Sequence, residues 1–412
     1  MVGMLCELLA LVLKESTEFA EGHLFSYLSA TGYGLLFILV PGAGLLLVWI
    51  FNNYIHKDAP NKGLGEVLDV IDGTKESIKP SRAVTHFFNG FFTVSSGGST
   101  GIEVSTVIAS SAIGNAAGRW MTMDAKEKKY LLIAGAAAGI AALFNSPLGG
   151  FFFAVEVLAD VLSFDLLGII LCALSGAFLV SMPFHTSSLF VATHHIWRWK
   201  AVPFFMIFSL ISAVLSTYMT KLVVWNKSVF IKFLNAKMRI IVGGIMVGIG
   251  VFFLRPLYGE GYKTIQELLS GDITAFNDGI FQGVFSPALI LLGFVVILAV
   301  KPLITSVTLA SGGDGGVFAP SLFLGAVTGL VYAHSVNQWI GSDLIEVNFI
   351  IVGMAALLSA SIQAPLTAVF LTASITGNYD LLFPLLITAF FSKLIAGKIL
   401  PYTVYSYARI AR

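Results

Sequence analysis

Charged residues are scarce in this chain, and their scarcity excludes an ordinary soluble protein. Only 11% of the residues are charged, whereas soluble domains usually carry about 25%. Hydrophobic residues instead make up 57% of the chain. Uncharged runs long enough to span a bilayer occur at 166–184, 202–220 and 280–300. We therefore expect a polytopic membrane protein.

Cysteine is almost absent too, and so are the residue clusters that enzymes and metal sites need. The two cysteines, Cys6 and Cys172, lie in apolar surroundings and predict no disulfide or metal framework. No His-Glu-x-x-His or comparable set favours an enzyme. A net charge of +1 gives no reason to expect nucleic-acid binding. We expect no metal and no cofactor.

Two glycine-rich segments carry the strongest functional signal. Residues 97–104 read GGSTGIEV, and residues 312–320 read GGDGGVFAP. Each segment runs into an apolar stretch in which we expect a helix. Successive backbone N–H groups at a helix N-terminus bind anions without a formal positive charge. Two such segments in one membrane chain predict a pore or carrier for a small inorganic anion, built from internal repeats.

The repeat is visible in the spacing of small residues and prolines. At an offset of 218, Gly135 falls on Gly353 and Pro147 on Pro365, and the glycine-rich segments align at an offset of 215. We expect one domain over 1–412 with halves near 1–200 and 201–412. The two prolines predict kinks within apolar helices, used either for packing or for a ligand contact. The relative orientation of the halves stays open.

These residues resemble the CLC chloride channels and chloride/proton exchangers over nearly the whole chain. Residues 315–320, GGVFAP, resemble the family's second anion-binding loop, and residues 134–148 resemble the helix after its gate segment. The resemblance implies an all-α fold of two inverted-topology helical repeats whose broken helices meet at mid-membrane. It also implies a homodimer with one anion pathway per subunit, in the lipid bilayer of a prokaryotic inner membrane. No regulatory nucleotide-binding pair follows Arg412, so no C-terminal regulatory domain is expected.

Departures from the family pattern decide the predicted mechanism. The family's gate motif, Gly-(Arg/Lys)-Glu-Gly-Pro, aligns with residues 98–102, so that Thr100 takes the place of the proton-carrying glutamate. The inner proton relay aligns with Val157. Because neither residue titrates, we predict passive, proton-uncoupled transport of chloride or a similar anion. The alternative is an anion/proton antiporter in which Glu103, one helical turn after Thr100, is a relocated gating and proton-carrying glutamate.

The predicted anion site draws on both halves of the chain. Its members are Lys62, Gly98, Ser99, Thr100, Gly101, Ile102, Gly316, Val317, Phe318 and Tyr402, with Glu103 and Thr100 at the gate. By the resemblance, Lys62 replaces a serine that contacts the central anion, although its side chain could also reach the surface. Tyr402 supplies a hydroxyl, and a one-residue slip onto Thr403 stays open.

Four acidic residues have an alternative structural role. Glu103 is expected either as the gate or in a pair with Lys62, Arg119 or a helix start. Asp314 is expected to cap a helix or to fix its loop. Glu156 and Glu260 are expected to make structural contacts, with no partner identifiable from the sequence. The preferred anion, and the choice between channel and carrier, stay open.

Overall fold

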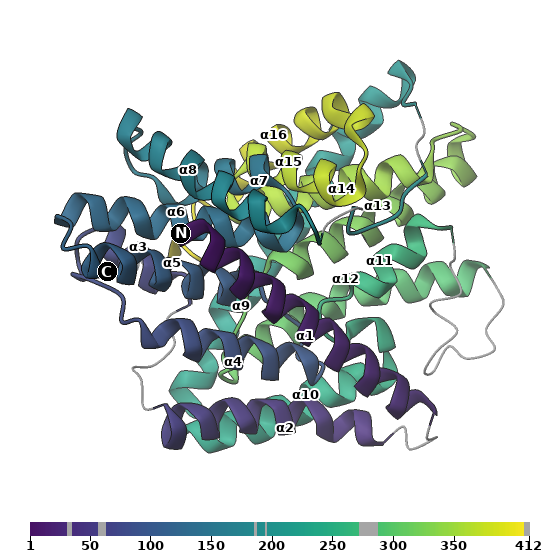
Figure 1. Ribbon diagram of the computed structural model, residues 1–412. Helices are drawn as coiled ribbons and strands as arrows, with labels where there is room; N and C mark the ends of the chain where they lie inside the picture. Colours follow the sequence, from purple (N-terminus) through teal and green to yellow (C-terminus); the bar gives the residue numbers. More distant parts are fainter. Residues whose placement is uncertain (31–34, 57–62, 185–187, 194–195, 272–286, 408–412) are drawn as a thin grey trace.

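The computed structural model describes residues 1–30, 35–56, 63–184, 188–193, 196–271 and 287–407 (Figure 1). Among these residues the regular structure is helical apart from one isolated bridge. The α-helices are α1 (Val2–Ala30), α2 (Leu36–Ile50), α3 (Gly65–Ile71), α4 (Ser81–Ser95), α5 (Glu103–Trp120), α6 (Ala125–Phe144), α7 (Pro147–Phe153), α8 (Phe164–Ser181), α9 (Val202–Phe233), α10 (Ala236–Phe253), α11 (Tyr262–Leu269), α12 (Pro287–Ala310), α13 (Phe318–Ile340), α14 (Glu346–Ile362), α15 (Pro365–Thr376) and α16 (Leu382–Ile399).

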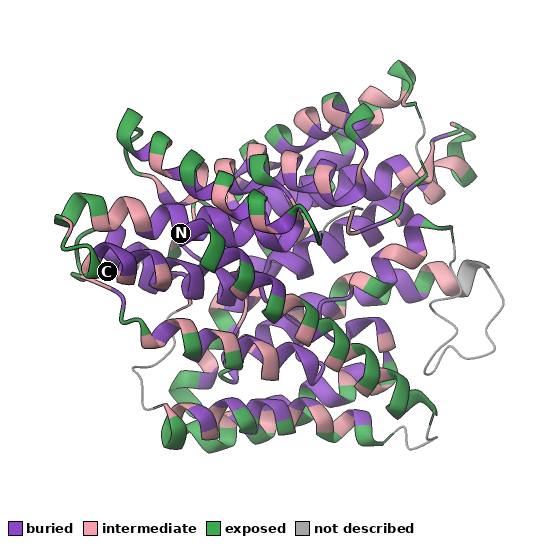
Figure 2. Cartoon of the chain, viewed as in Figure 1, coloured by how far each residue is buried: buried purple, intermediate pink, exposed green. Residues whose placement is uncertain are grey.

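The structure confirms a polytopic membrane protein. Seven helical segments in the described part of the chain are long and apolar enough to cross a membrane, and they include α2, α8, α9, α10, α12, α13 and α16. Large apolar side chains face outward on these helices, such as Phe164 at 94% exposure. Buried residues instead fill the interior (Figure 2). An apolar outer surface around a buried interior is suited to a lipid environment.

Two helix pairs, α5 with α6 and α13 with α14, form the buried centre and contact each other closely through glycine. A Cβ on Gly135 of α6 would lie 2.4 Å from the Ser110 carbonyl oxygen of α5. A Cβ on Gly353 of α14 would lie 2.2 Å from the Gly325 carbonyl oxygen of α13. Ser110 and Gly325 are related by the offset of 215, and the two glycines by 218. The repeat predicted from spacing is therefore realised as two equivalent helix contacts.

We predicted that the two prolines of the repeat kink continuous helices, and this prediction is wrong. Each proline instead begins a new helix. Helix α6 is followed by Asn145, whose φ is 47°, and α14 is followed by Gln363, whose φ is 60°. These left-handed residues stop each helix, and Pro147 and Pro365 then occupy the first turn of α7 and α15. The short helices α7 and α15 consequently leave the long ones in a new direction.

Candidate anion site

The two glycine-rich segments meet in space. The backbones of Gly101 and Gly316 exchange two hydrogen bonds as an isolated antiparallel bridge, with N···O distances of 3.5 and 3.2 Å. The Thr100 hydroxyl donates to the Gly316 carbonyl oxygen at 2.8 Å. Directly beyond this bridge, α5 begins at Glu103 and α13 at Phe318. The positive ends of two helices from different halves thus face a common region, where they favour negative charge.

Each predicted backbone donor of the first segment is engaged within the protein. The N–H groups of Gly98, Thr100 and Gly101 donate to backbone oxygens, and that of Ser99 donates to the Thr308 hydroxyl. The Ile102 N–H donates to the Glu260 carboxylate at 2.9 Å. A protein carboxylate therefore already lies where the sequence predicts an external anion.

The Glu103 carboxylate lies between the two helix starts. It is 1% exposed, and the Tyr262 hydroxyl donates to its Oε1 atom at 2.7 Å. A Cβ on Gly101 would lie 2.0 Å from Glu103 Oε2 and 2.7 Å from Ala319 Cβ. Glycine at position 101 therefore leaves room for the carboxylate beside the first turn of α13. The predicted structural partner Arg119 instead donates to the Ile78 carbonyl oxygen.

A tyrosine that the sequence did not single out reaches the second segment. The Val317 N–H donates to the hydroxyl oxygen of Tyr405 at 3.2 Å, and Tyr405 is buried. Tyr402, the predicted hydroxyl, instead packs its ring against Tyr407. The Thr403 hydroxyl accepts the N–H groups of the turn that follows it. Proline at 401 breaks the helical period, so the spacing alone did not identify the tyrosine that faces the helix start.

Two further predicted positions lie apart from this region or outside the described residues. Lys62 lies outside the described residues, so its expected approach to the anion stays a prediction. Val157 lies half-buried on the short π-helix η2 (Ala154–Leu158). Its neighbour Glu156 accepts the N–H groups of Leu366 and Thr367 at 3.0 and 2.7 Å. Glu156 thus caps α15, which gives the structural contact that we expected for it.

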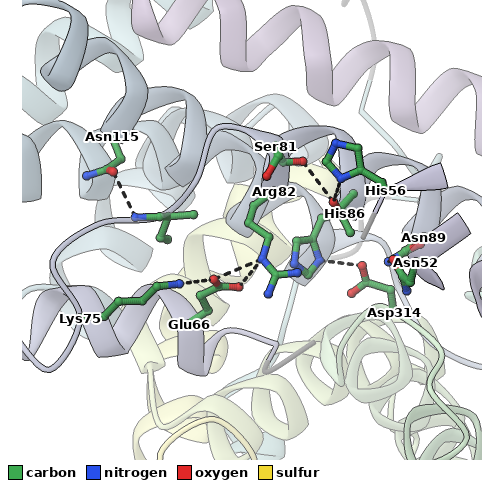
Figure 3. A network of polar contacts seen from close by, with 12 residues as sticks. Asn52, His56, Glu66, Lys75, Ser81, Arg82, His86, Asn89, Asn115 and Asp314 are labelled. Carbon is green, nitrogen blue, oxygen red and sulfur yellow. Dashed lines mark hydrogen bonds and ion pairs between the residues drawn. The ribbon is translucent and has the colours of Figure 1, made fainter. Parts of the chain in front are cut away.

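Asp314 fixes its loop, as expected, and also pairs with a histidine. Its N–H donates to the Thr93 hydroxyl at 3.0 Å. Its carboxylate lies 2.6 Å from Nδ1 of His86, and both side chains are at most 1% exposed (Figure 3). The pair therefore joins α4 to the loop directly before Gly315 and Gly316.

His86 belongs to a wider polar network on α4. One helical turn earlier, Arg82 contacts the Glu66 carboxylate at 3.0 Å, and Lys75 contacts the same carboxylate at 2.5 Å (Figure 3). Lys75 is partly exposed at 39%, whereas the Arg82 and Glu66 side chains are buried. Helix α4 therefore carries two buried side chains that contact acids, Arg82 on Glu66 of α3 and His86 on Asp314 in the loop before α13.

A cavity of about 420 Å³ adjoins the start of α5 through the segment that holds Glu260 and Tyr262. Carboxylates from three parts of the chain line it, Glu18 and Glu21 from α1, Glu260 from the turn before α11 and Glu267 from α11 itself. Basic side chains lie on the same walls, Arg255 and Lys263. The cavity gives an ion or a proton a polar approach to the region between the two helix starts.

Comparison with known proteins connects this geometry to one family. A family model described as voltage gated chloride channel matches residues 43–397. A Vibrio parahaemolyticus protein named H(+)/Cl(-) exchange transporter ClcA is 29% identical over 385 residues, which cover 88% of this chain and 77% of that protein.

Two solved structures share the fold. A slow cyanobacterial Cl-/H+ antiporter has a TM-score of 0.83 at 22% identity, covering 100% of this chain and 96% of that one. A CLC-type fluoride/proton antiporter has a TM-score of 0.81 at 21% identity, covering 98% of this chain and 94% of that one. The predicted all-α CLC fold is confirmed.

The predicted passive, proton-uncoupled transport is corrected by these relatives. The name of the Vibrio protein contradicts that prediction and favours its alternative, an anion/proton antiporter. The passive prediction gave most weight to Thr100 and Val157, which do not titrate. The structure places the titratable carboxylate of Glu103 between the same two helix starts.

Proposed function

This chain belongs to the voltage-gated chloride channel family, and on that premise we propose that it exchanges chloride or a similar small anion for protons. The observation that carries the proposal is the buried Glu103 carboxylate between the starts of α5 and α13. The exchange named for the Vibrio relative supports it.

Exchange requires one group that competes with the anion and also carries the proton. When ionised, the Glu103 carboxylate is attracted by the two helix starts, each worth roughly half a unit of positive charge. It then fills the place of an anion and accepts the hydrogen bond from Tyr262. When protonated, Glu103 loses this attraction and leaves the place to the anion. Because Val157 has no titratable group, the proposed exchange relies on Glu103 for proton uptake.

The anion itself needs donors that replace its water. We propose that the Phe318 N–H supplies one of them, because the first N–H groups of a helix have no partner within that helix. The Val317 N–H contributes indirectly, since it holds the Tyr405 hydroxyl at the start of α13. The Tyr405 hydroxyl, which accepts from Val317, turns its own hydrogen toward the anion. Lys62 and the residues of the first segment stay further predicted contributors.

The test is proton movement driven by a chloride gradient in vesicles that contain the purified protein. We expect the wild-type protein to move protons uphill. Glu103→Gln removes the proton carrier, so proton movement should fall to background while chloride flux continues. The matched control is Glu346→Gln, which alters a surface carboxylate 2.9 Å from His334 and should leave coupling intact. Chloride flux without proton movement in the wild-type protein would refute exchange.

We also propose a homodimer with one pathway per subunit and a single transmembrane domain of two halves, 1–200 and 201–412. The equivalent glycine contacts in α5–α6 and α13–α14 support the two halves. Light scattering of the purified protein in detergent would measure the mass of the complex. A mass of one copy would overturn the dimer and leave the proposed exchange untouched.

A further inference from the structure

Residues 258–262, which are the turn before α11 and the first residue of that helix, contact the end of α4 and the start of α5 through three alternate residues. The Tyr258 hydroxyl donates to the Ser95 carbonyl oxygen at 2.9 Å. The Glu260 carboxylate accepts the Ile102 N–H at 2.9 Å, and the Tyr262 hydroxyl donates to Glu103 at 2.7 Å. Residues 258–262 thus contact both the Ile102 N–H, at the N-cap of α5, and the proposed proton carrier.

A lysine supports this turn from the opposite side. Lys301 of α12 is fully buried, and its Nζ atom donates to the carbonyl oxygens of Leu257 and Gly259 at 3.3 and 3.1 Å. The lysine therefore fixes the backbone on both sides of Tyr258. The Glu260 side chain, in contrast, borders the cavity of about 420 Å³. The backbone of the turn is thus fixed by Lys301, while open space lies beside the carboxylate.

We propose that Glu260 is a second gating carboxylate, which competes with the transported anion for the Ile102 N–H on the cavity side. The proposal rests on the proposed function, in which Ile102 is a predicted anion donor. In the described structure, Ile102 is the donor of the segment 98–102 whose acceptor is a carboxylate. The N–H groups of residues 98–101 donate to backbone or hydroxyl oxygens instead. These acceptors are neutral, so an arriving anion does not repel them.

Glu260 and Glu103 place two negative groups at one helix start. Glu260 is 4% exposed and Glu103 is 1% exposed. If both carboxylates are ionised, an anion close to them is strongly repelled. An anion that arrives from the cavity therefore enters when Glu260 is neutral or has swung into the cavity. Tyr262 then still holds Glu103, so the two gates open in sequence.

The pH dependence follows from the charges around Glu260. Burial, and next the Glu103 and Glu21 carboxylates, raise the pKa of Glu260 well above its ordinary value. The titratable and charged groups around it, from every packed element, are Glu18, Glu21, Glu103, Arg255, Tyr258, Tyr262, Lys263, Glu267 and Lys301. As the pH falls through its pKa, Glu260 loses its charge and its competition with the anion ends. Anion affinity should therefore rise as the pH falls.

The experiment measures chloride binding to the purified wild-type protein by calorimetry between pH 5.5 and 8.5. Glu260→Gln keeps an oxygen that accepts the Ile102 N–H but removes the charge. We expect this variant to bind chloride about tenfold more tightly at high pH, a difference of one decade in affinity, and equally at low pH. The matched control is Glu267→Gln, which alters another carboxylate of the same cavity, paired with Lys263 at 3.8 Å. It should bind as the wild-type protein does.

Equal affinities of the wild-type protein and Glu260→Gln at every pH would overturn the second gate. Should Glu260→Gln fail to fold, Glu103→Gln provides the second measurement. Its chloride affinity should still rise as the pH falls, because Glu260 still titrates, and a flat profile would overturn the proposal. A wild-type protein that binds no chloride would instead refute the proposed function.

Discussion

At the residue scale, single side chains decide which donors at the helix starts are open to an anion. Glu103 was identifiable from the sequence, because a carboxylate in an apolar helix is costly unless it has a role. For Glu260 the sequence predicted a structural contact but no partner, since its contact with Ile102 joins residues 158 positions apart. Tyr405 was missed because Pro401 breaks the helical period, so the sequence does not show in which direction the following side chains point.

Tyr405 should contribute to anion affinity, whereas Tyr402 should contribute less. Tyr405→Phe removes a hydroxyl next to the Val317 N–H. A net hydrogen bond is worth roughly 0.5–1.5 kcal/mol, so we expect chloride affinity to fall about two- to tenfold. The comparison is Tyr402→Phe, whose ring packs on Tyr407. Calorimetry with chloride would decide, and an equal or larger loss for Tyr402→Phe would contradict the geometry.

The His86–Asp314 pair should matter for stability. His86→Gln removes the imidazole 2.6 Å from a fully buried carboxylate, and removing one partner of a buried pair costs roughly 3–5 kcal/mol. His86→Gln with Asp314→Asn should recover much of the loss, because no charge is then buried. His334→Gln is the control, since its pair with Glu346 is 35% and 37% exposed. Thermal unfolding in detergent would measure these differences, and a neutral His86→Gln would contradict the argument.

At the element scale, the repeat was predictable because glycines and prolines keep the same spacing in both halves although the residues between them differ. The offsets of 215 and 218 place Gly114 on Gly329 and Leu131 on Phe349. In the structure, a Cβ on Gly114 would lie 2.0 Å from the Leu131 oxygen, and one on Gly329 2.0 Å from the Phe349 oxygen. The helix breaks before Pro147 and Pro365 were not predictable, because they depend on left-handed residues that are not glycine.

These crossings predict a strong sensitivity to side-chain size. Gly353→Ala places a Cβ 2.2 Å from the Gly325 carbonyl oxygen, so the helices must separate. Overpacking of this kind typically costs about 1–3 kcal/mol. Gly168→Ala, in α8 where nothing lies within 4 Å, is the control and should be neutral or slightly stabilising. Unfolding measurements that rank the two variants equally would contradict tight packing of α13 on α14.

At the scale of the whole molecule, exchange of anions for protons has an electrical consequence. An anion and a proton carry opposite charges, so when they move in opposite directions they carry electric current in the same direction. Each turnover therefore transfers net charge, whatever the exchange ratio, and the membrane potential drives it. We expect proton uptake into vesicles to stop early unless valinomycin and potassium clamp the potential, and to reverse when the clamp is inverted. Uptake that ignores the clamp would contradict coupled exchange.

The contact of α13 with α14 also limits how such a cycle is able to proceed. At Gly325 and Gly353 the two backbones touch directly, with no rotatable group between them. Because no side chain separates the two helices, a change of rotamer does not let one helix slide along the other. Large tilting of α13 against α14 is therefore disfavoured. The remaining movements are small and local, such as those of acidic side chains at the ends of rigid helices. Its turnover rate would then depend on how quickly protons arrive.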